Sequence, residues 1–157
     1  MAQATATKKK ISTQSIVAAA ITHGNMLSLF KRSAKVGYDK HLWHCITGYL
    51  PSGESPISQV LSEIQEETGL CDSQLNLKKQ VIFHLIGDDG NRWEIHAFHF
   101  ESSSTSITLN WENEAAMWFD DHIDVSIVPW LKQVLSKLGL PDRFSLEDCF
   151  KSQQIFK

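Results

Sequence analysis

Three glutamates lie close together in the sequence at a spacing that suits one side of an α-helix. Glu63, Glu66 and Glu67 stand at positions i, i+3 and i+4, so a helix would gather them within about 100° of one face. Their charges repel one another, and they fall near the helix C-terminus, where carboxylates are disfavoured. A hard cation such as Mg²⁺ would relieve both costs, because it binds carboxylate oxygens together with water and substrate phosphates. For these residues alone, the alternative is an ordinary solvated acidic surface.

The surrounding segment carries a longer motif. Gly48–Leu70 reads GYLPSGESPISQVLSEIQEETGL and resembles the Nudix box, the signature of the Nudix (MutT-like) hydrolases. The family pattern is G-x5-E-x7-R-E-U-x-E-E-x-G-U, in which U is a bulky aliphatic residue, and eight of its nine defined positions match. The resemblance implies the Nudix fold over about residues 13–140.

The resemblance also implies a reaction and a set of site residues. Nudix enzymes hydrolyse a nucleoside diphosphate linked to another group, and water attacks a phosphorus with the help of Mg²⁺ or Mn²⁺. By resemblance, Glu66 and Glu67 are metal ligands, and Glu63 is a ligand or the base that accepts the proton of the water. The expected catalytic residues are therefore Glu63 and Glu67. Glu54 would be a supporting ligand, and the backbone at Gly48 would help to hold a metal ion or position the loop.

Two positions depart from the family pattern. Ser62 replaces an arginine that usually pairs with a box glutamate, so the glutamates must be held by another group, and Lys40 and Arg32 are candidates. Tyr49 stands where a second glycine is common, and it either narrows the loop, stacks on a substrate or lies at the surface. The missing arginine favours an alternative function, a catalytically weakened Nudix-fold module that binds a nucleotide or a protein. An isomerase of isoprenoid diphosphates on the same fold is a third hypothesis.

Side chains outside the box are candidates for the rest of the site. Family members commonly add an acidic residue from another loop, and Glu112 or Glu114 could supply it, the alternative being an exposed loop carboxylate. Trp43, Trp93 and Trp111 could stack on a nucleobase, and core packing is the alternative for each of them. The expected partner is a small nucleotide-like diphosphate such as a nucleoside triphosphate.

Local signals around the motif predict an α+β fold, with a mixed β-sheet sandwiched between helices. Ser55 is a good N-cap, Pro56 suits the first helical position and Gly69 suits the C-cap, so we expect a helix between them. The turn His23–Asn25 predicts a hairpin between the first two strands. Strands are expected at 15–22, 26–30, 42–46, 81–86, 93–100, 107–109 and 116–119, and a second helix at 128–138.

The length of 157 residues suits a single domain. We expect a disordered basic tail at 1–11, the Nudix domain at 12–140 and a C-terminal tail at 141–157, in which Ser145 could cap a short helix. With 42% apolar and 21% charged residues the chain is of ordinary globular composition. This excludes a disordered chain, a collagen and a disulfide-rich miniprotein.

Charge and apolar patterning narrow the partners. Fifteen basic against 18 acidic side chains give a net charge of −3, so no nucleic-acid partner is expected. No apolar run approaches 18 residues, so no membrane span is expected. The three cysteines form no CxxC pair and are expected to be reduced thiols in a cytoplasmic protein. The His41/His44 and His96/His99 pairs do not indicate zinc, because an offset of three on a strand points the rings to opposite faces. A homodimer is left open.

Overall fold

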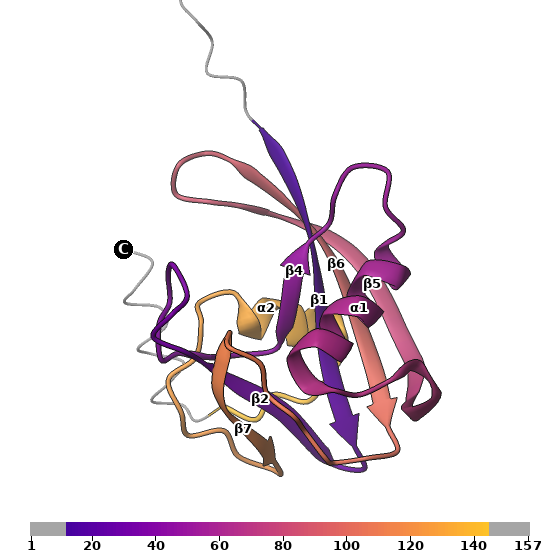
Figure 1. The fold of residues 1–157 in the computed structure, drawn as a ribbon. Helices are drawn as coiled ribbons and strands as arrows, with labels where there is room; N and C mark the ends of the chain where they lie inside the picture. Colours follow the sequence, from indigo (N-terminus) through magenta and orange to yellow (C-terminus); the bar gives the residue numbers. More distant parts are fainter. Residues whose placement is uncertain (1–11, 145–157) are drawn as a thin grey trace, which may run out of the picture.

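The computed structural model describes residues 12–144, and the predicted tail at 1–11 and the predicted helix after Ser145 lie outside them. Seven strands and two α-helices make up this part of the chain (Figure 1). In chain order they are β1 (Thr13–His23), β2 (Met26–Arg32), β3 (Trp43–His44), β4 (Ile46–Tyr49), α1 (Pro56–Thr68), β5 (Leu75–Ile86), β6 (Arg92–Ser102), β7 (Asn113–Phe119) and α2 (Leu131–Lys137), with a 3-10 turn at Asp72–Gln74.

Strand β1 is the centre of the sheet. It runs parallel to β6 over ten residue pairs, from Thr13 opposite Arg92 to Thr22 opposite Glu101. Strand β5 then pairs antiparallel with β6 and forms one edge of the sheet. All the other strand pairs are antiparallel, so the sheet is mixed, as the sequence predicts.

The other edge of β1 is shared by two strands. Strand β4 pairs with residues 16–19 of β1, and β2 pairs with its last two residues, Thr22 and His23. Strand β2 then carries β3 and β7 on its own two edges. The sheet therefore divides beyond the middle of β1, and β4 and β2 separate from each other (Figure 1).

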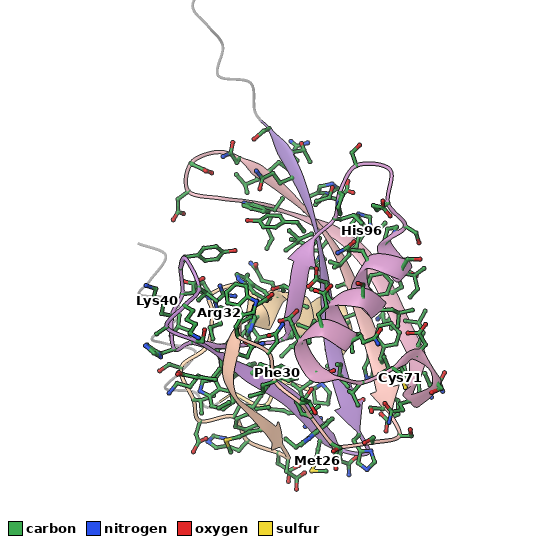
Figure 2. The ribbon with its side chains drawn as sticks, in the orientation of Figure 1. Met26, Phe30, Arg32, Lys40, Cys71 and His96 are labelled. Carbon is green, nitrogen blue, oxygen red and sulfur yellow. The ribbon has the colours of Figure 1, made fainter. Side chains whose placement is uncertain are left out.

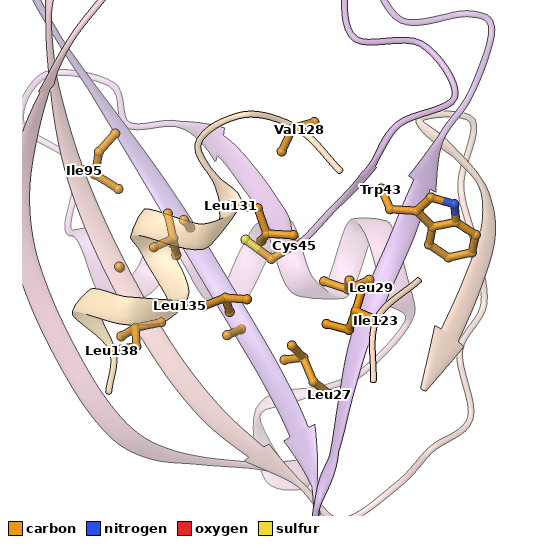
Figure 3. Close-up of a cluster of buried hydrophobic side chains, with 14 of the residues drawn as sticks. Leu27, Leu29, Trp43, Cys45, Ile95, Ile123, Val128, Leu131, Leu135 and Leu138 are labelled. Atoms are coloured by element: carbon orange, nitrogen blue, oxygen red, sulfur yellow. The ribbon is translucent and has the colours of Figure 1, made fainter. Parts of the chain in front are cut away.

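The two helices cover opposite faces of the sheet. Helix α1 lies in front of β1 and β4 in Figure 1, and α2 lies behind them. The first face buries Val60 and Ile64 of α1 in a cluster with Phe98 and Phe100. Figure 3 shows the second cluster, which joins α2 to β2 and β6 and includes these side chains: Leu27, Leu29, Ile95, Leu131, Leu135 and Leu138. The predicted α+β sandwich is thus confirmed.

Several element boundaries differ from the sequence prediction for identifiable reasons. The strand predicted at 42–46 is two short strands, because the chain crosses from β2 to β1 at the buried Cys45. Residues 107–109 form no strand, because the Thr108 amide donates to the Thr68 carbonyl at 2.8 Å. Strand β5 begins at Leu75, earlier than predicted, because its largely exposed first half pairs with β6, starting with Leu75 opposite Ser102.

The second helix is shorter than predicted. It begins at Leu131, because residues 126–128 run beside Trp43 instead: the Trp43 amide donates to Ser126 at 2.9 Å and the Val128 amide donates to Trp43 at 3.0 Å. Residues 141–144, expected in a tail, are held to the domain by Arg143, whose guanidinium donates to the carbonyls of Asn25 and Asp120 at 2.6 and 2.7 Å. Within residues 12–144 no helix combines the length and apolar character needed to cross a membrane.

Candidate active site

Helix α1 begins and ends where its sequence predicts, and this fixes the direction of its glutamates. The Ser55 hydroxyl accepts from the Ser58 amide at 3.4 Å, and Pro56 occupies the first turn. Gly69 ends the helix with φ +75°, a left-handed conformation in which glycine carries no steric penalty. The helix is 13 residues long, and its last two turns carry Glu63, Glu66 and Glu67.

The three glutamates on α1 differ in burial. Glu67 is fully buried, Glu63 is partly buried and Glu66 is exposed. Glu67 Oε1 accepts from the amide nitrogen of Asn113 at 3.2 Å, whereas its Oε2 is buried without a hydrogen-bond partner. The three glutamates therefore range from the core to the solvent. Glu67 is not part of a solvated acidic surface.

Glu63 is held by a neutral amide and by a glycine. Gln59, one turn earlier on α1, donates to Glu63 Oε1 at 3.0 Å. On strand β4, a Cβ added to Gly48 would lie 2.3 Å from Glu63 Cδ and Oε1. Gly48 therefore gives the carboxyl group the space that it occupies against the strand.

The cation expected to replace the missing arginine is not found in contact with the box. Within residues 12–144, neither Arg32 nor Lys40 forms an ion pair with a box glutamate. Figure 2 places Lys40 at the outer edge of its loop and Arg32 on the side toward β4. Burial raises the pKa of Glu67 and of Glu112, and the charge of Arg32 opposes that rise only in part.

A fourth carboxylate joins the cluster from outside the box. Glu112, in the turn before β7, lies within electrostatic range of Glu63, Glu66 and Glu67. Glu114, the other candidate, is not part of the cluster. It lies on the exposed side of β7, where it contacts His41 at 2.7 Å and Lys31 at 3.5 Å.

Burial and mutual repulsion raise the pKa of the clustered carboxyls. Burial, followed by the charges of Glu112 and Glu63, raises the pKa of Glu67 to about 9. Burial is also the main cause of the raised pKa of Glu63 and of Glu112, and the charge of Glu66 adds to both. Without a cation, the cluster therefore favours protonated carboxyls.

A cleft of about 680 Å³ opens beside these carboxylates, lined by Gly48, Glu63 and Glu112. Arg32 and Lys35 are also in its wall. Aromatic side chains form much of the remainder: Tyr38, Tyr49, Trp93, Trp111 and Trp130. The cleft thus combines a charged end with aromatic walls.

The structure separates the predicted substrate-binding side chains. Tyr49, Trp111 and Trp93 line the cleft, as does Glu112. Trp43 does not, because it is buried beside Phe119 in the cluster of Figure 3, with ring centroids 5.8 Å apart. Glu54 is exposed in the loop before α1 and is not among the residues that line the cleft.

Several residues of the site were not anticipated from the sequence. Gln59 has a local signal, because it precedes Glu63 by four residues on one helix. Asn113, Tyr38 and Trp130 have none, because their positions depend on how β7, the 33–42 loop and α2 pack.

The donor set fits a hard divalent cation. As placed, no three His, Cys, Asp or Glu side chains in residues 12–144 are arranged to hold a metal ion together. Glu67 nevertheless presents a buried oxygen without a partner, and the neighbouring carboxyls of Glu63 and Glu112 are only partly buried. Carboxylate oxygens are the ligands preferred by Mg²⁺ and Mn²⁺.

Four other reactive side chains are not among the residues that line the cleft: His96, His99, Cys45 and Cys71. His96 contacts Glu94 at 2.6 Å, and His99 contacts Thr22 at 2.7 Å on the opposite sheet face, as expected for a strand. Cys45 and Cys71 are free, and burial raises the pKa of Cys45 to about 12. A nucleophilic role for Cys45 is thereby disfavoured.

Solved structures of known proteins match this fold. A MutT Nudix hydrolase from Burkholderia pseudomallei is 20% identical, with a TM-score of 0.65 over 81% of this chain and 98% of that chain. A Nudix hydrolase from M. smegmatis is 16% identical, with a TM-score of 0.63 over 85% and 91% of the two chains. A C. elegans Ap4A hydrolase is 12% identical, with a TM-score of 0.52 over 92% and 96%. No family model matches the sequence, and no curated protein does.

The chain therefore has the Nudix fold. The resemblance inferred from the box is confirmed at the level of the fold. At these identities the comparisons concern architecture, and the chemistry must be argued from the side chains of this chain.

Proposed function

We propose that this protein is a metal-dependent hydrolase that cleaves a phosphoanhydride bond in a nucleoside diphosphate-linked substrate, such as a nucleoside triphosphate. The observation that carries the proposal is the buried Glu67 carboxyl, whose Oε2 has no hydrogen-bond partner. Glu67 does not itself line the cleft, but it lies close enough to the cleft-lining Glu63 and Glu112 for their charges to raise its pKa. Solved structures of the same fold include a MutT Nudix hydrolase and an Ap4A hydrolase, which supports this class of reaction.

The proposed roles follow from the placement of each group. Glu67, Glu63, Glu66 and Glu112 would hold Mg²⁺ or Mn²⁺, which when bound neutralises phosphate charge and acidifies a water molecule. Glu63 is partly exposed at the cleft and suits the base that accepts the proton of the attacking water. The oxygen of that water would bond to phosphorus as the anhydride bond breaks.

The cleft walls supply groups for the rest of the substrate. Arg32 and Lys35 would offset phosphate charge that the metal ions leave uncompensated. Trp93, Trp111 and Tyr49 offer rings on which a nucleobase could stack, since base–aromatic stacking contributes about 1–3 kcal/mol per base in single-strand binders.

Ser62 favours a second candidate function, a nucleotide-binding or protein-binding module with weak catalysis. It is exposed on α1 and supplies no charge to the neighbouring glutamates. A family arginine at this position would keep them ionised and oriented. The two candidates make different predictions for turnover, although both allow a nucleotide to bind.

A product assay separates the two candidates. Purified protein is incubated with nucleoside triphosphates, dinucleoside polyphosphates and nucleotide sugars, in Mg²⁺ or Mn²⁺ and with excess EDTA, and products are resolved by ion-exchange chromatography. The hydrolase predicts turnover that requires millimolar metal and stops in EDTA. Binding without turnover supports the module, and undiminished turnover in metal-stripped protein contradicts the metal-dependent mechanism.

A further inference from the structure

A chain of buried polar groups leads away from Glu67 into the protein. Asn113 donates to Glu67 Oε1 at 3.2 Å, and the side-chain oxygen of Asn113 lies 2.8 Å from His44 Nε2. All three side chains are at most 3% exposed. They come from α1, β7 and β3, which are distant in the sequence.

The positions of Asn113 and His44 are fixed by the strands that carry them. Asn113 is the first residue of β7, opposite Arg32, where the β2–β7 register shifts. A register shift of this kind redirects a side chain, and here Asn113 is buried between the cleft-lining Glu112 and the exposed Glu114. His44, in β3, lies opposite Phe30 of β2. Its ring packs edge to face on the ring of Trp130, with the centroids 6.4 Å apart.

Donors and acceptors match at the two hydrogen bonds of this chain of groups, which ends at His44 Nδ1, a buried atom without a partner. The Asn113 nitrogen donates to the carboxyl of Glu67, so its oxygen remains to accept from a histidine N–H. His44 thereby holds the amide in the orientation that presents its nitrogen to Glu67. Oε1 of Glu67 is engaged by this bond, and Oε2 is the oxygen left without a partner.

We infer that Asn113, oriented by His44, is the positioning residue for Glu67. This neutral pair takes the orienting role of the missing arginine, since within residues 12–144 no cation forms an ion pair with a box glutamate. The inference rests on the proposed function, because it treats Glu67 as a metal ligand. Outer hydrogen bonds of this kind orient metal ligands, and their loss typically weakens metal affinity or activity by about 10–100-fold.

Isosteric variants test the inference through metal binding without substrate. Asn113→Leu keeps the shape of the side chain and removes both hydrogen bonds. His44→Leu removes the donor to Asn113, whereas His44→Gln keeps an N–H that can reach it. Free Mn²⁺ is followed by electron paramagnetic resonance during titration of each protein, and Mg²⁺-dependent kcat and KM are measured in parallel.

The expected changes in Mn²⁺ affinity, kcat and KM distinguish a positioning role of Asn113 from a purely structural one. Asn113→Leu and His44→Leu should weaken Mn²⁺ affinity by about 10-fold or more and lower kcat, with the substrate KM changed less than about 3-fold. His44→Gln should stay within about 3-fold of wild type. Ser28→Ala is the matched control, because it removes another buried hydrogen bond, to the Ile21 carbonyl at 3.0 Å, and should leave Mn²⁺ affinity unchanged.

The outcomes separate this inference from the proposed function. Folded Asn113→Leu protein with wild-type Mn²⁺ affinity overturns the positioning role. If Asn113→Leu does not fold, equal Mn²⁺ affinities of His44→Leu and His44→Gln overturn it instead. Wild-type protein that neither binds Mn²⁺ nor hydrolyses a diphosphate overturns the proposed function, and the positioning role with it.

Discussion

Glu67 is a carboxyl group in an environment that opposes its charge. Its raised pKa of about 9 lies above the ordinary value of 4.5, chiefly because of burial. A folded-state pKa above the unfolded value means that the folded state holds the proton more tightly, so stability falls as the pH rises from about 4.5 to about 9. Metal-free protein should therefore lose stability through this pH range.

Glu67→Gln should reverse this loss and abolish function. The amide has the same shape without the charge, so metal-free Glu67→Gln should equal the thermal midpoint of wild type near pH 5 and exceed it increasingly toward pH 9. With metal and substrate, turnover should fall by roughly two orders of magnitude or more, because a ligand is lost. Calorimetry across this pH range and a product assay measure the two effects. Wild-type turnover in the variant would remove Glu67 from the site.

Gly48→Ala should affect function more than stability. The added Cβ would meet the end of the Glu63 side chain at 2.3 Å, and that flexible side chain can move while the strand remains. Because Glu63 is displaced, we expect at least a roughly 10-fold loss of turnover with a midpoint within about 4 °C of wild type, a cost near 1 kcal/mol. A variant with unchanged turnover would show that the position of Glu63 against β4 has no role.

At the scale of the element, α1 is stabilised by its ends. Ser55→Ala removes the acceptor for the Ser58 amide and should cost about 1 kcal/mol, or about 2–4 °C in thermal midpoint. Ser55→Asp should restore the midpoint, because a carboxylate also accepts this bond and interacts favourably with the helix N-terminus. Thermal unfolding of wild type, Ser55→Ala and Ser55→Asp measures the difference. Equal midpoints would show that the cap is not stabilising.

How far the sequence predicts an element depends on whether its signals are local. Ser55, Pro56 and Gly69 act on their own neighbours, and α1 is found at the predicted residues. The start of α2 depends instead on Trp43, more than 80 residues earlier, which pairs with residues 126–128. No local pattern contains that contact, and the predicted helix is therefore three residues too long at its start.

The same distinction applies to the candidate site. The glutamates and Gly48 are among the eight matching positions of the box, so the sequence alone predicts them. The structure places Glu63, Glu66, Glu67 and Gly48 together. Asn113 and Trp130 belong to elements that reach the box only through tertiary packing. Trp43 and Glu114 were plausible by residue type, but strand direction turns the first into the core and the second toward solvent.

At the scale of the whole molecule, protons and metal ions compete for one cluster. A cation binds these carboxyls only when they are ionised. Their raised pKa values keep them protonated at lower pH. Bound metal stabilises the folded state according to its concentration and affinity. Addition of 5 mM Mn²⁺, roughly ten times a submillimolar dissociation constant, should raise the thermal midpoint. This increase should be larger at pH 8.5 than at pH 6.

Two variants control this prediction. Glu114→Gln removes an exposed carboxylate outside the cluster, and it should keep the full Mn²⁺ response at both pH values. Glu67→Gln should lose most of the response. A Mn²⁺ effect that is independent of pH, or equal in the two variants, would show that the cation binds elsewhere on the surface.

The pairing of β1 with β6 also determines when this chain can fold. Residues that face each other across this ladder, such as Ser15 and Glu94, are 79 positions apart, so the central pairing closes a long loop before its contacts contribute. During synthesis, β1 and β2 can form a hairpin early, but β1 gains its longest partner only when residues 92–102 have left the ribosome. Until then, one edge of a largely apolar strand stays unpaired, and in this interval the nascent chain is most exposed to aggregation and to capture by chaperones.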